Sequence, residues 1–248
     1  MSAAPAPPRS ILIVGATGGI GAALLHEVEH RYPAASVFAW ARQPHSTAAR
    51  RATWQRVDIT NEPSIEAAAP AISELDLVIV ATGLLQREAT SDHQELRPEK
   101  TWRSLDATAM AESFAINTIA PALIAKHVLP KFPRDRRAVF AALSARVGSI
   151  SDNRLGGWYS YRASKAALNQ ILKTLSIELA VRYPYAVCVG LHPGTVATGL
   201  SQPFQNNVAP EKLFTAETSA RHLLDVIDQL ATQHSGGIYD WAGLKVPE

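Results

Sequence analysis

The chain has 248 residues, a formal net charge of only +2 and one cysteine, Cys188. A single cysteine excludes an intramolecular disulfide and a cysteine metal cluster, and the small charge argues against nucleic-acid binding. The 47% of hydrophobic residues suffices for a large core, and no linker-like segment divides the chain. We therefore expect a flexible tail over residues 1–9 and one domain over residues 10–248.

Short apolar runs alternate with helical patterns along the chain. The strand-like runs are Ile11–Val14, Val37–Ala41, Thr53–Val57, Leu75–Ala81, Ala138–Leu143, Ala186–Leu191 and Gly237–Trp241. The helical patterns are Ile20–Arg31, Pro63–Ser73, Ala107–Lys131, Tyr161–Tyr183 and Ala216–Gln233. This alternation predicts an α/β protein, a doubly wound parallel Rossmann sheet of about seven strands in three α/β/α layers. Ligands bind such sheets beyond the carboxyl ends of the strands.

A glycine-rich turn follows the first strand-like run and opens a helix. Its candidate binding residues are Gly15, Thr17, Gly18, Gly19, Ile20 and Gly21. Glycines let the backbone approach a pyrophosphate closely, and the helix start offers unpaired N–H groups. Strand, turn and helix together predict a dinucleotide site; the alternative is a tight turn without a ligand.

Residues after the next three strand-like runs are further candidates. Arg42 can pair a 2′-phosphate through its guanidinium, which favours NADP(H) over NAD(H); the alternative is a solvated arginine. Asp58 and Ile59 follow the third run, where the aspartate could also be a helix cap or a turn residue. Gly83, after the fourth run, would allow close approach of a cofactor.

Tyr161 and Lys165 lie four residues apart and should share one helix face. A cation beside a phenol favours the phenolate and lowers the pKa of the phenol, so the pair is a candidate general acid/base. Tyr159 is followed four residues later by Ala163 and lacks such a cation. His127 and His192 show no metal-ligand spacing, so we expect structural roles for them and no metal site.

The glycine pattern Gly15-x-x-x-Gly19-x-Gly21 together with Tyr161-x-x-x-Lys165, in a chain of this length, resembles the short-chain dehydrogenase/reductase family. The run Ser144–Ile150, the loop at Asp152-Asn153 and the ending Gly-Gly-Ile-Tyr-Asp-Trp-Ala-Gly are similar to its C-factor and Sniffer-type carbonyl reductase branch. Two positions depart from the family: Val14 stands where threonine is frequent, and Ala81-Thr82-Gly83 replaces Asn-Asn-Ala-Gly.

The resemblance implies an NADP(H)-dependent oxidoreductase that acts on a carbonyl or alcohol substrate. Tyr161 would donate the proton, and Lys165 would bind the nicotinamide ribose and tune the phenol. Ser144 would hold the substrate oxygen, with Ser149 as the alternative, and Asn117 would support a proton relay. Asp58 would bind adenine. Pro193, Gly194, Val196 and Thr198 would hold the nicotinamide carboxamide.

No apolar run reaches transmembrane length, and residues 1–8 lack the apolar stretch of a signal peptide, so we expect a cytoplasmic protein with no membrane partner. The resemblance also implies a homodimer or homotetramer, paired through helices 107–131 and 161–183. Residues 84–99, 147–159 and 199–210 would line the substrate pocket, the last as a mobile lid or a plain surface loop. C-factor is linked with intercellular signalling, so a non-enzymatic nucleotide-binding or signalling protein is the competing interpretation. A sugar-nucleotide epimerase is a weaker one.

Overall fold

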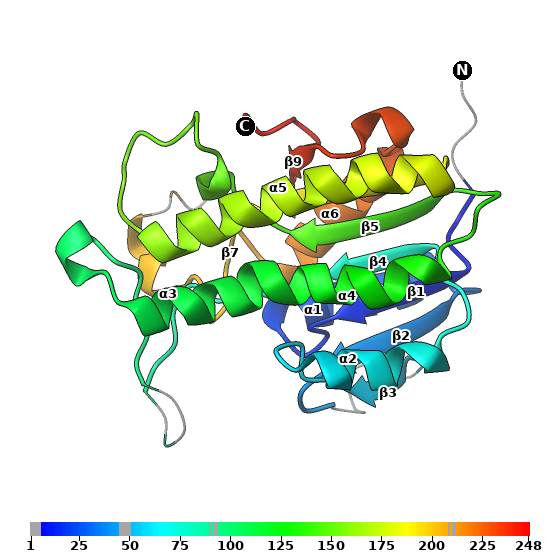
Figure 1. The fold of residues 1–248 in the computed structure, drawn as a ribbon, viewed down its shortest axis with the longest axis horizontal. Helices are drawn as coiled ribbons and strands as arrows, with labels where there is room; N and C mark the ends of the chain where they lie inside the picture. Colours follow the sequence, from blue (N-terminus) through cyan, green and yellow to red (C-terminus); the bar gives the residue numbers. More distant parts are fainter. Residues whose placement is uncertain (1–5, 45–50, 90, 92–93, 208, 210–211) are drawn as a thin grey trace.

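The computed structural model describes residues 6–44, 51–89, 91, 94–207, 209 and 212–248. Within these ranges a parallel seven-stranded sheet has the order β3-β2-β1-β4-β5-β6-β9 (Figure 1). Its strands are β1 Ser10–Val14, β2 Ser36–Ala41, β3 Thr53–Arg56, β4 Leu77–Val80, β5 Ala138–Leu143, β6 Ala186–His192 and β9 Ile238–Asp240. The strand order reverses beside β1, so β1 and β4 end at the crevice where such folds bind ligands.

Helices cover both faces of the sheet, which confirms the predicted three-layer Rossmann fold. They are α1 Gly19–Arg31, α2 Glu62–Ala68, α3 Ala107–Phe114, α4 Ala120–Val128, α5 Tyr159–Arg182 and α6 Ala216–Gln229. Alternate strand residues face opposite sides: Ile11 and Ile13 pack toward α1 and α6, and Leu12 and Val14 toward α2, α4 and α5. The core is therefore two apolar layers separated by the sheet.

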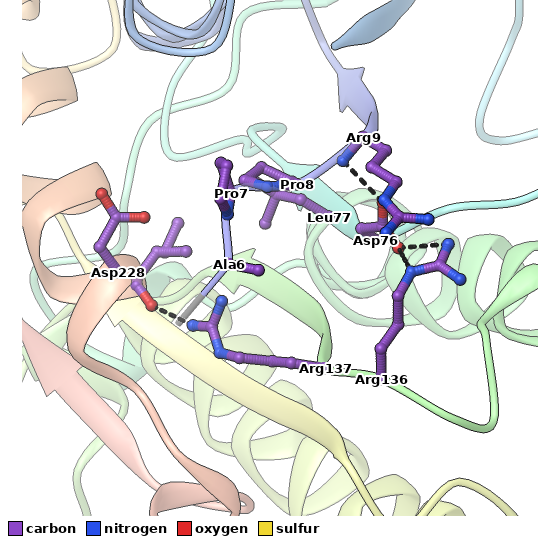
Figure 2. A pocket seen from close by; sticks show the side chains of 10 residues that line it. Ala6, Pro7, Pro8, Arg9, Asp76, Leu77, Arg136, Arg137 and Asp228 are labelled. Carbon is purple, nitrogen blue, oxygen red and sulfur yellow. Dashed lines mark hydrogen bonds and ion pairs between the residues drawn. The ribbon is translucent and has the colours of Figure 1, made fainter. Parts of the chain in front are cut away.

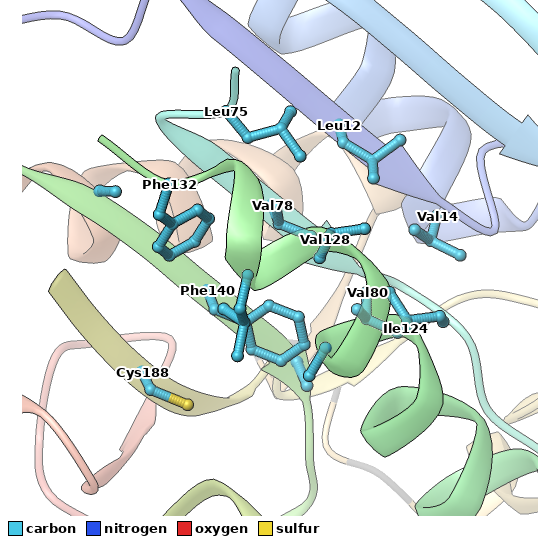
Figure 3. Close-up of a cluster of buried hydrophobic side chains, with 14 of the residues drawn as sticks. Leu12, Val14, Leu75, Val78, Val80, Ile124, Val128, Phe132, Phe140 and Cys188 are labelled. Atoms are coloured by element: carbon cyan, nitrogen blue, oxygen red, sulfur yellow. The ribbon is translucent and has the colours of Figure 1, made fainter. Parts of the chain in front are cut away.

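Cys188 lies in the second of these layers, opposite Phe140 of the neighbouring strand β5 (Figure 3). Burial raises the pKa of its thiol to about 12, because the apolar surroundings disfavour a thiolate. Cys188 is thus the inert strand residue that the sequence indicated.

The segment expected as one helix over residues 107–131 is interrupted. A π-helical turn, Ala115–Ile119, separates α3 from α4, and Asn117 within it is fully buried. Contrary to the sequence analysis, Ala107–Lys131 is long and apolar enough to span a membrane. A helix that packs in a protein core can have the same length and composition. In this segment Ile124 and Val128 contribute to the core.

A small parallel pair, β7 Thr195–Val196 and β8 Leu213–Phe214, was not predicted. It joins the two ends of the segment 197–212, which contains the lid expected at residues 199–210. A 3₁₀ turn, η6, occupies Gln202–Asn207. Val208 and Pro210 of the expected lid lie outside the described residues.

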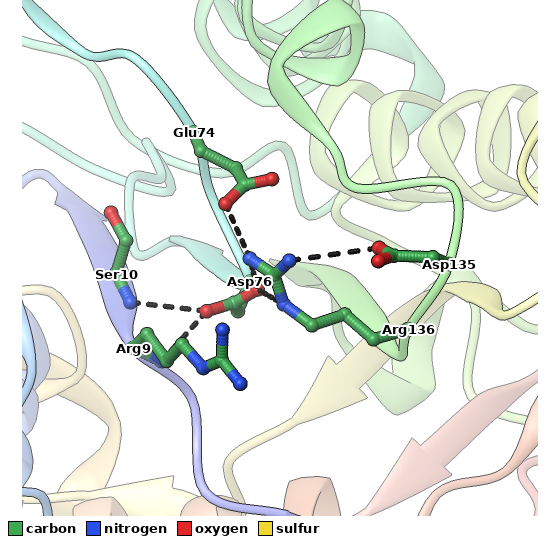
Figure 4. A network of polar contacts seen from close by, with 6 residues as sticks. All are labelled: Arg9, Ser10, Glu74, Asp76, Asp135 and Arg136. Carbon is green, nitrogen blue, oxygen red and sulfur yellow. Dashed lines mark hydrogen bonds and ion pairs between the residues drawn. The ribbon is translucent and has the colours of Figure 1, made fainter.

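An ion-pair network ties the amino-terminal ends of the strands together (Figure 4). Asp76, which is 5% exposed, accepts from the backbone N–H of Arg9 at 2.7 Å, from that of Ser10 at 3.2 Å and from Arg136 Nε at 2.9 Å. Arg137 donates to two carbonyls at the end of α6. Arg136 and Arg137, in the turn before β5, thus stabilise the fold. Arg9, which was expected in the flexible tail, is held through the hydrogen bond from its backbone N–H to Asp76.

Candidate functional site

The glycine turn has the geometry that close approach of a phosphate requires. Gly15 has φ +81°, and a Cβ on Gly21 would lie 2.1 Å from the Gly15 carbonyl oxygen. The first helix begins at Gly19 without a side-chain cap at Gly18 and without an acidic residue in its first turn. Its first N–H groups and the positive end of its dipole are therefore open to an anion. These residues fit the pyrophosphate of a dinucleotide.

Thr82, directly after β4, supplies a second observation that fits a cofactor. Its hydroxyl oxygen is buried and has no hydrogen-bond partner within the described part of the chain. A buried hydroxyl without a partner costs about 1–3 kcal/mol, which a polar ligand group would offset. Thr82 also touches the glycine turn, since a Cβ on Gly15 would lie 2.7 Å from its Cγ2. Sequence reasoning missed Thr82 because it departs from the family pattern.

Arg42 and Asp58 lie near each other after β2 and β3. The Asp58 carboxyl accepts from the Thr60 hydroxyl at 2.7 Å and from its backbone N–H at 2.9 Å. The Thr60 hydroxyl bond and, more weakly, the charge of Arg42 lower the pKa of Asp58. Asp58 is therefore a turn residue, which is one of the alternatives that the sequence left open. Arg42 is exposed, and it forms no ion pair within the described ranges.

The predicted catalytic residues converge beyond the ends of β4 and β5. Lys165, 2% exposed, donates from Nζ to the Leu143 carbonyl at 2.7 Å, and its Nζ lies 5.8 Å from the Tyr161 ring centroid. A Cβ on Gly83 would lie 3.8 Å from Lys165 Nζ and 3.6 Å from Asn117 Oδ1. Gly83 therefore opens a space that Asn117 and Lys165 border.

Asn117 links the loop after β4 to the catalytic helix. Its amide accepts from the Leu84 backbone N–H at 2.8 Å and donates to the Leu84 carbonyl at 2.8 Å. It also donates to Ser164 Oγ at 3.1 Å. Asn117 lies in the π turn, where the regular helical hydrogen bonding is interrupted, and its side chain bonds to the Leu84 backbone and to Ser164. Ser164 is thus a further site residue that the sequence analysis did not single out.

The Tyr161 phenol does not show the depressed pKa that was expected. Burial raises the pKa of Tyr161 to about 12 and lowers the pKa of Lys165 to about 7. Each shift has the sign that desolvation imposes on a charged form. An amine with a pKa near 7 is only partly protonated at neutrality, so it stabilises a phenolate less than a full cation would.

Ser144 and Ser149 have different surroundings. Ser144, 3% exposed, donates from its hydroxyl to Asn169 Oδ1 at 2.6 Å. Ser149 Oγ instead contacts the Asp152 backbone N–H at 3.1 Å and the Glu248 carbonyl at 3.4 Å. Ser149 is therefore bonded to its own loop and to the last residue of the sequence, whereas Ser144 is bonded to α5. Asn169 was not foreseen.

The segment after β6 closes over the glycine turn. A Cβ on Gly19 would lie 2.7 Å from Thr198 Cγ2, and Val196 is buried in β7. The Pro193 carbonyl accepts from the Ser219 hydroxyl at 2.9 Å. Gly194 has φ +79° and packs so closely on Phe214 that a Cβ would lie 2.7 Å from its ring. Thr198 thus lies against the glycine turn, and Pro193, Gly194 and Val196 lie in the same segment after β6.

Among the described residues, no group of three or more histidine, cysteine or acidic side chains could hold a metal ion. His127 and His192, for which structural roles were expected, lie in different surroundings. Burial lowers the pKa of His192 to about 4, which keeps its ring neutral. His127 lies 3.0 Å from Glu62 on the surface of α4 and α2.

Aromatic side chains border Tyr161. The ring centroid of Trp158 lies 6.3 Å from that of Tyr161 and 4.9 Å from that of Phe204 in η6. The loop after β4 contacts the segment 197–212, because Gln86 Nε2 donates to the Gly199 carbonyl at 2.8 Å. Trp158 and Phe204 thus bring an apolar surface next to Tyr161.

A cavity of about 180 Å³ lies at the opposite edge of the sheet, between residues 6–9, β4 and α6 (Figure 2). Its charged side chains include Asp76 and Arg136, which already pair with each other, and Arg137, which donates to backbone carbonyls. It borders the amino-terminal ends of the strands, away from the residues described above.

Comparison with known proteins gives consistent matches. The family model for short chain dehydrogenases matches residues 9–209. A 1-hydroxy-2-glutathionyl-2-methyl-3-butene dehydrogenase of Rhodococcus sp. is 32% identical over 92% of this chain and 94% of its own. C-signal of Myxococcus xanthus is 37% identical over 58% of this chain and 81% of its own. The structure of an NADPH-bound carbonyl reductase from chicken fatty liver superposes with a TM-score of 0.82 at 26% identity, covering 97% of this chain and 94% of that one.

Proposed function

The chain belongs to the short-chain dehydrogenase family, in the branch that holds C-factor and Sniffer-type carbonyl reductases, and we propose that it interconverts a carbonyl compound and its alcohol with NADP(H). The observation that carries this proposal is the convergence of Lys165, Asn117 and the Ser144 loop beside Tyr161. A protein that only bound a nucleotide would have no chemical need for this buried set.

The chain's own residues can hold and protonate a reacting oxygen. A bound nicotinamide would supply the hydride to the carbonyl carbon, or accept it from the alcohol. Tyr161, with a pKa of about 12, carries its proton at neutral pH and can donate it from the phenol to the forming alkoxide. Ser144 would hydrogen-bond the same oxygen. Lys165 and Asn117 are the polar groups through which the phenolate can be reprotonated. A positioned acid of this kind contributes roughly 10²–10⁴-fold.

The preference for NADP(H) is part of the proposal. Arg42 is an exposed guanidinium after β2 with no ion pair in the described chain, so it is free to meet a 2′-phosphate. The structurally similar carbonyl reductase from chicken fatty liver holds NADPH. Thr82, Gly83 and the glycine turn would hold the rest of the cofactor.

The competing function is signalling without catalysis, which the likeness to C-signal of Myxococcus xanthus favours. The two are separated by assaying NADPH oxidation against a panel of aldehydes and ketones. The reductase proposal predicts turnover that Tyr161→Phe lowers at least about 10²-fold. Tyr159→Phe is the matched control, since Tyr159 is a partly exposed tyrosine on the same helix. Tight NADPH binding without turnover of any carbonyl would favour signalling.

We also propose that two copies pair through α3, α4 and α5 in the cytoplasm. Apolar side chains are exposed on these elements: Ile119 of the π turn between α3 and α4, and Ile177 and Val181 of α5, the last at 82%. A stable interface would bury them. Light scattering should give twice or four times the chain mass, and Val181→Glu should reduce it; an unchanged monomer mass would reject the pairing. Cell fractionation tests the location.

A further inference from the structure

The start of the catalytic helix lacks the cap that a helix of this length normally uses. The 24-residue helix α5 begins at Tyr159, and its N-cap residue Trp158 provides no side-chain cap. No acidic residue stands in its first turn. The first N–H groups of a helix need partners from outside it. Tyr161 is the third residue of this helix, so whatever supplies those partners also affects its placement.

Glu99, from the opposite loop, supplies these partners. Its carboxyl group accepts from the Ser160 backbone N–H at 3.2 Å and from the Ser160 hydroxyl through its second oxygen. Its backbone carbonyl accepts from the Trp158 N–H at 2.5 Å. Glu99 thus bonds Trp158 and Ser160, two of the three residues immediately before Tyr161, although it lies about 60 residues earlier in the chain.

The burial of Glu99 indicates a specific role for its charge. Glu99 is 6% exposed, and no lysine or arginine within the described ranges forms an ion pair with it. An acidic group is costly to bury unless hydrogen bonds and a favourable field compensate. The N–H groups and the positive dipole end of α5 provide that field. The Glu99 side chain therefore points at the start of α5, and within the described ranges it pairs with no charged side chain.

The backbone next to Glu99 requires such a restraint. Gly156, Gly157 and Trp158 have φ values of +63°, +66° and +53°, and a tryptophan in the left-handed region costs about 1–3 kcal/mol unless its surroundings fix it. Arg162 holds the same bend from the other side, donating to the Gly157 carbonyl at 3.0 Å. The resulting conformation brings the Trp158 ring against those of Tyr161 and Phe204.

The loop that carries Glu99 is itself anchored. Arg87 and Leu96 exchange backbone hydrogen bonds at 2.9 and 2.8 Å, and Arg87 pairs with Glu112 on α3. Glu99 can therefore act as a fixed support.

We propose that Glu99 is a positioning residue, which caps the start of α5 from the substrate-side loop and thereby fixes Tyr161 and Trp158 at the mouth of the active site. Its consequence for catalysis rests on the proposed reductase function. Its consequence for the helix start does not, so the two can fail separately.

The test compares Glu99→Gln with Glu95→Gln, since Glu95 is an exposed residue on the same loop, paired only with Arg97. The glutamine at 99 keeps the size but removes the negative charge from the start of α5, and its NH₂ must donate to the Ser160 hydroxyl oxygen in place of accepting from that hydroxyl. Amide hydrogen exchange over residues 159–163 should rise at least about 10-fold in Glu99→Gln and stay unchanged in Glu95→Gln. Unaltered exchange in Glu99→Gln would overturn the proposal, whether or not the protein reduces carbonyls.

Kinetics supply the second measurement when the parent protein is active. A displacement of Tyr161 by about 1 Å can cost 10²-fold, so kcat should fall about 10–10²-fold in Glu99→Gln. The NADPH dissociation constant should not change, because the glycine turn lies on other elements. In a Ser160→Ala background the same substitution should cost less, since the hydroxyl partner of Glu99 is already gone and only the backbone N–H of residue 160 remains. Faster exchange with an unchanged kcat would reduce Glu99 to a stabilising contact and reject its positioning role.

Discussion

Replacing Asn117 with leucine should weaken the fold through groups that only this side chain satisfies. The substitution keeps the approximate size but removes both amide bonds to the backbone of Leu84, at 2.8 Å each, and the bond to Ser164. Ser164 keeps its own bond to the Tyr161 carbonyl. The main loss is therefore two unpaired backbone groups beside a fully buried position. At about 1–3 kcal/mol each, the expected loss is about 2–6 kcal/mol.

Urea unfolding followed by circular dichroism measures this loss as a lower midpoint with an unchanged slope. Thr118→Val is the matched comparison, because it removes a single bond, from the Thr118 hydroxyl to the Ser164 carbonyl at 2.7 Å. It should cost about 1 kcal/mol. If Asn117→Leu proved no more destabilising than Thr118→Val, the bridge between the loop after β4 and α5 would not exist as described.

Three further predictions concern other parts of the site. Asn169→Leu removes the acceptor of the Ser144 hydroxyl, so kcat should fall about 10-fold with NADPH binding unchanged; equal kcat would show that Asn169 does not orient Ser144. Arg42→Asp should shift the ratio of kcat/KM values from NADPH toward NADH by at least about 10-fold, and an unchanged ratio would remove Arg42 from the cofactor site. Burial lowers the pKa of His192 to about 4 from an ordinary 6.5. As the pH falls, His192 is therefore protonated in the unfolded chain before it is protonated in the folded chain. The free energy of unfolding should consequently fall by at most about 3 kcal/mol between pH 6.5 and pH 4. His192→Asn should reduce this fall in denaturant melts at the two pH values, and an identical fall would refute the assignment.

The sheet and the residues at its carboxyl edge could be predicted from the sequence because their signals are local. Strand, glycine turn and helix follow one another within residues 10–31, and the spacing of Tyr161 and Lys165 on a helix depends only on helical geometry. The π turn at Asn117 was missed: asparagine is a poor helix-interior residue, yet one unbroken helix was expected over residues 107–131.

The contacts that complete the site could not be predicted because they join distant segments. Glu99 meets Ser160 across 61 positions, and Ser144 meets Asn169 across 25. Only the packing of the loop after β4 against α5 brings the first pair together. The direction of the Tyr161 pKa was wrong for a related reason: helical spacing placed a lysine nearby, but the burial that raises the phenol's pKa and lowers the amine's appears only in three dimensions.

The most direct measurement follows the hydride itself. NADPH carrying deuterium at the transferable position of C4 is incubated with the protein and a carbonyl that it turns over, and the alcohol is examined by mass spectrometry and NMR. The account predicts one deuterium on the carbinol carbon, and a proton from solvent on the oxygen. An alcohol without carbon-bound deuterium, or the same deuterated alcohol formed at an equal rate by Tyr161→Phe, would contradict it.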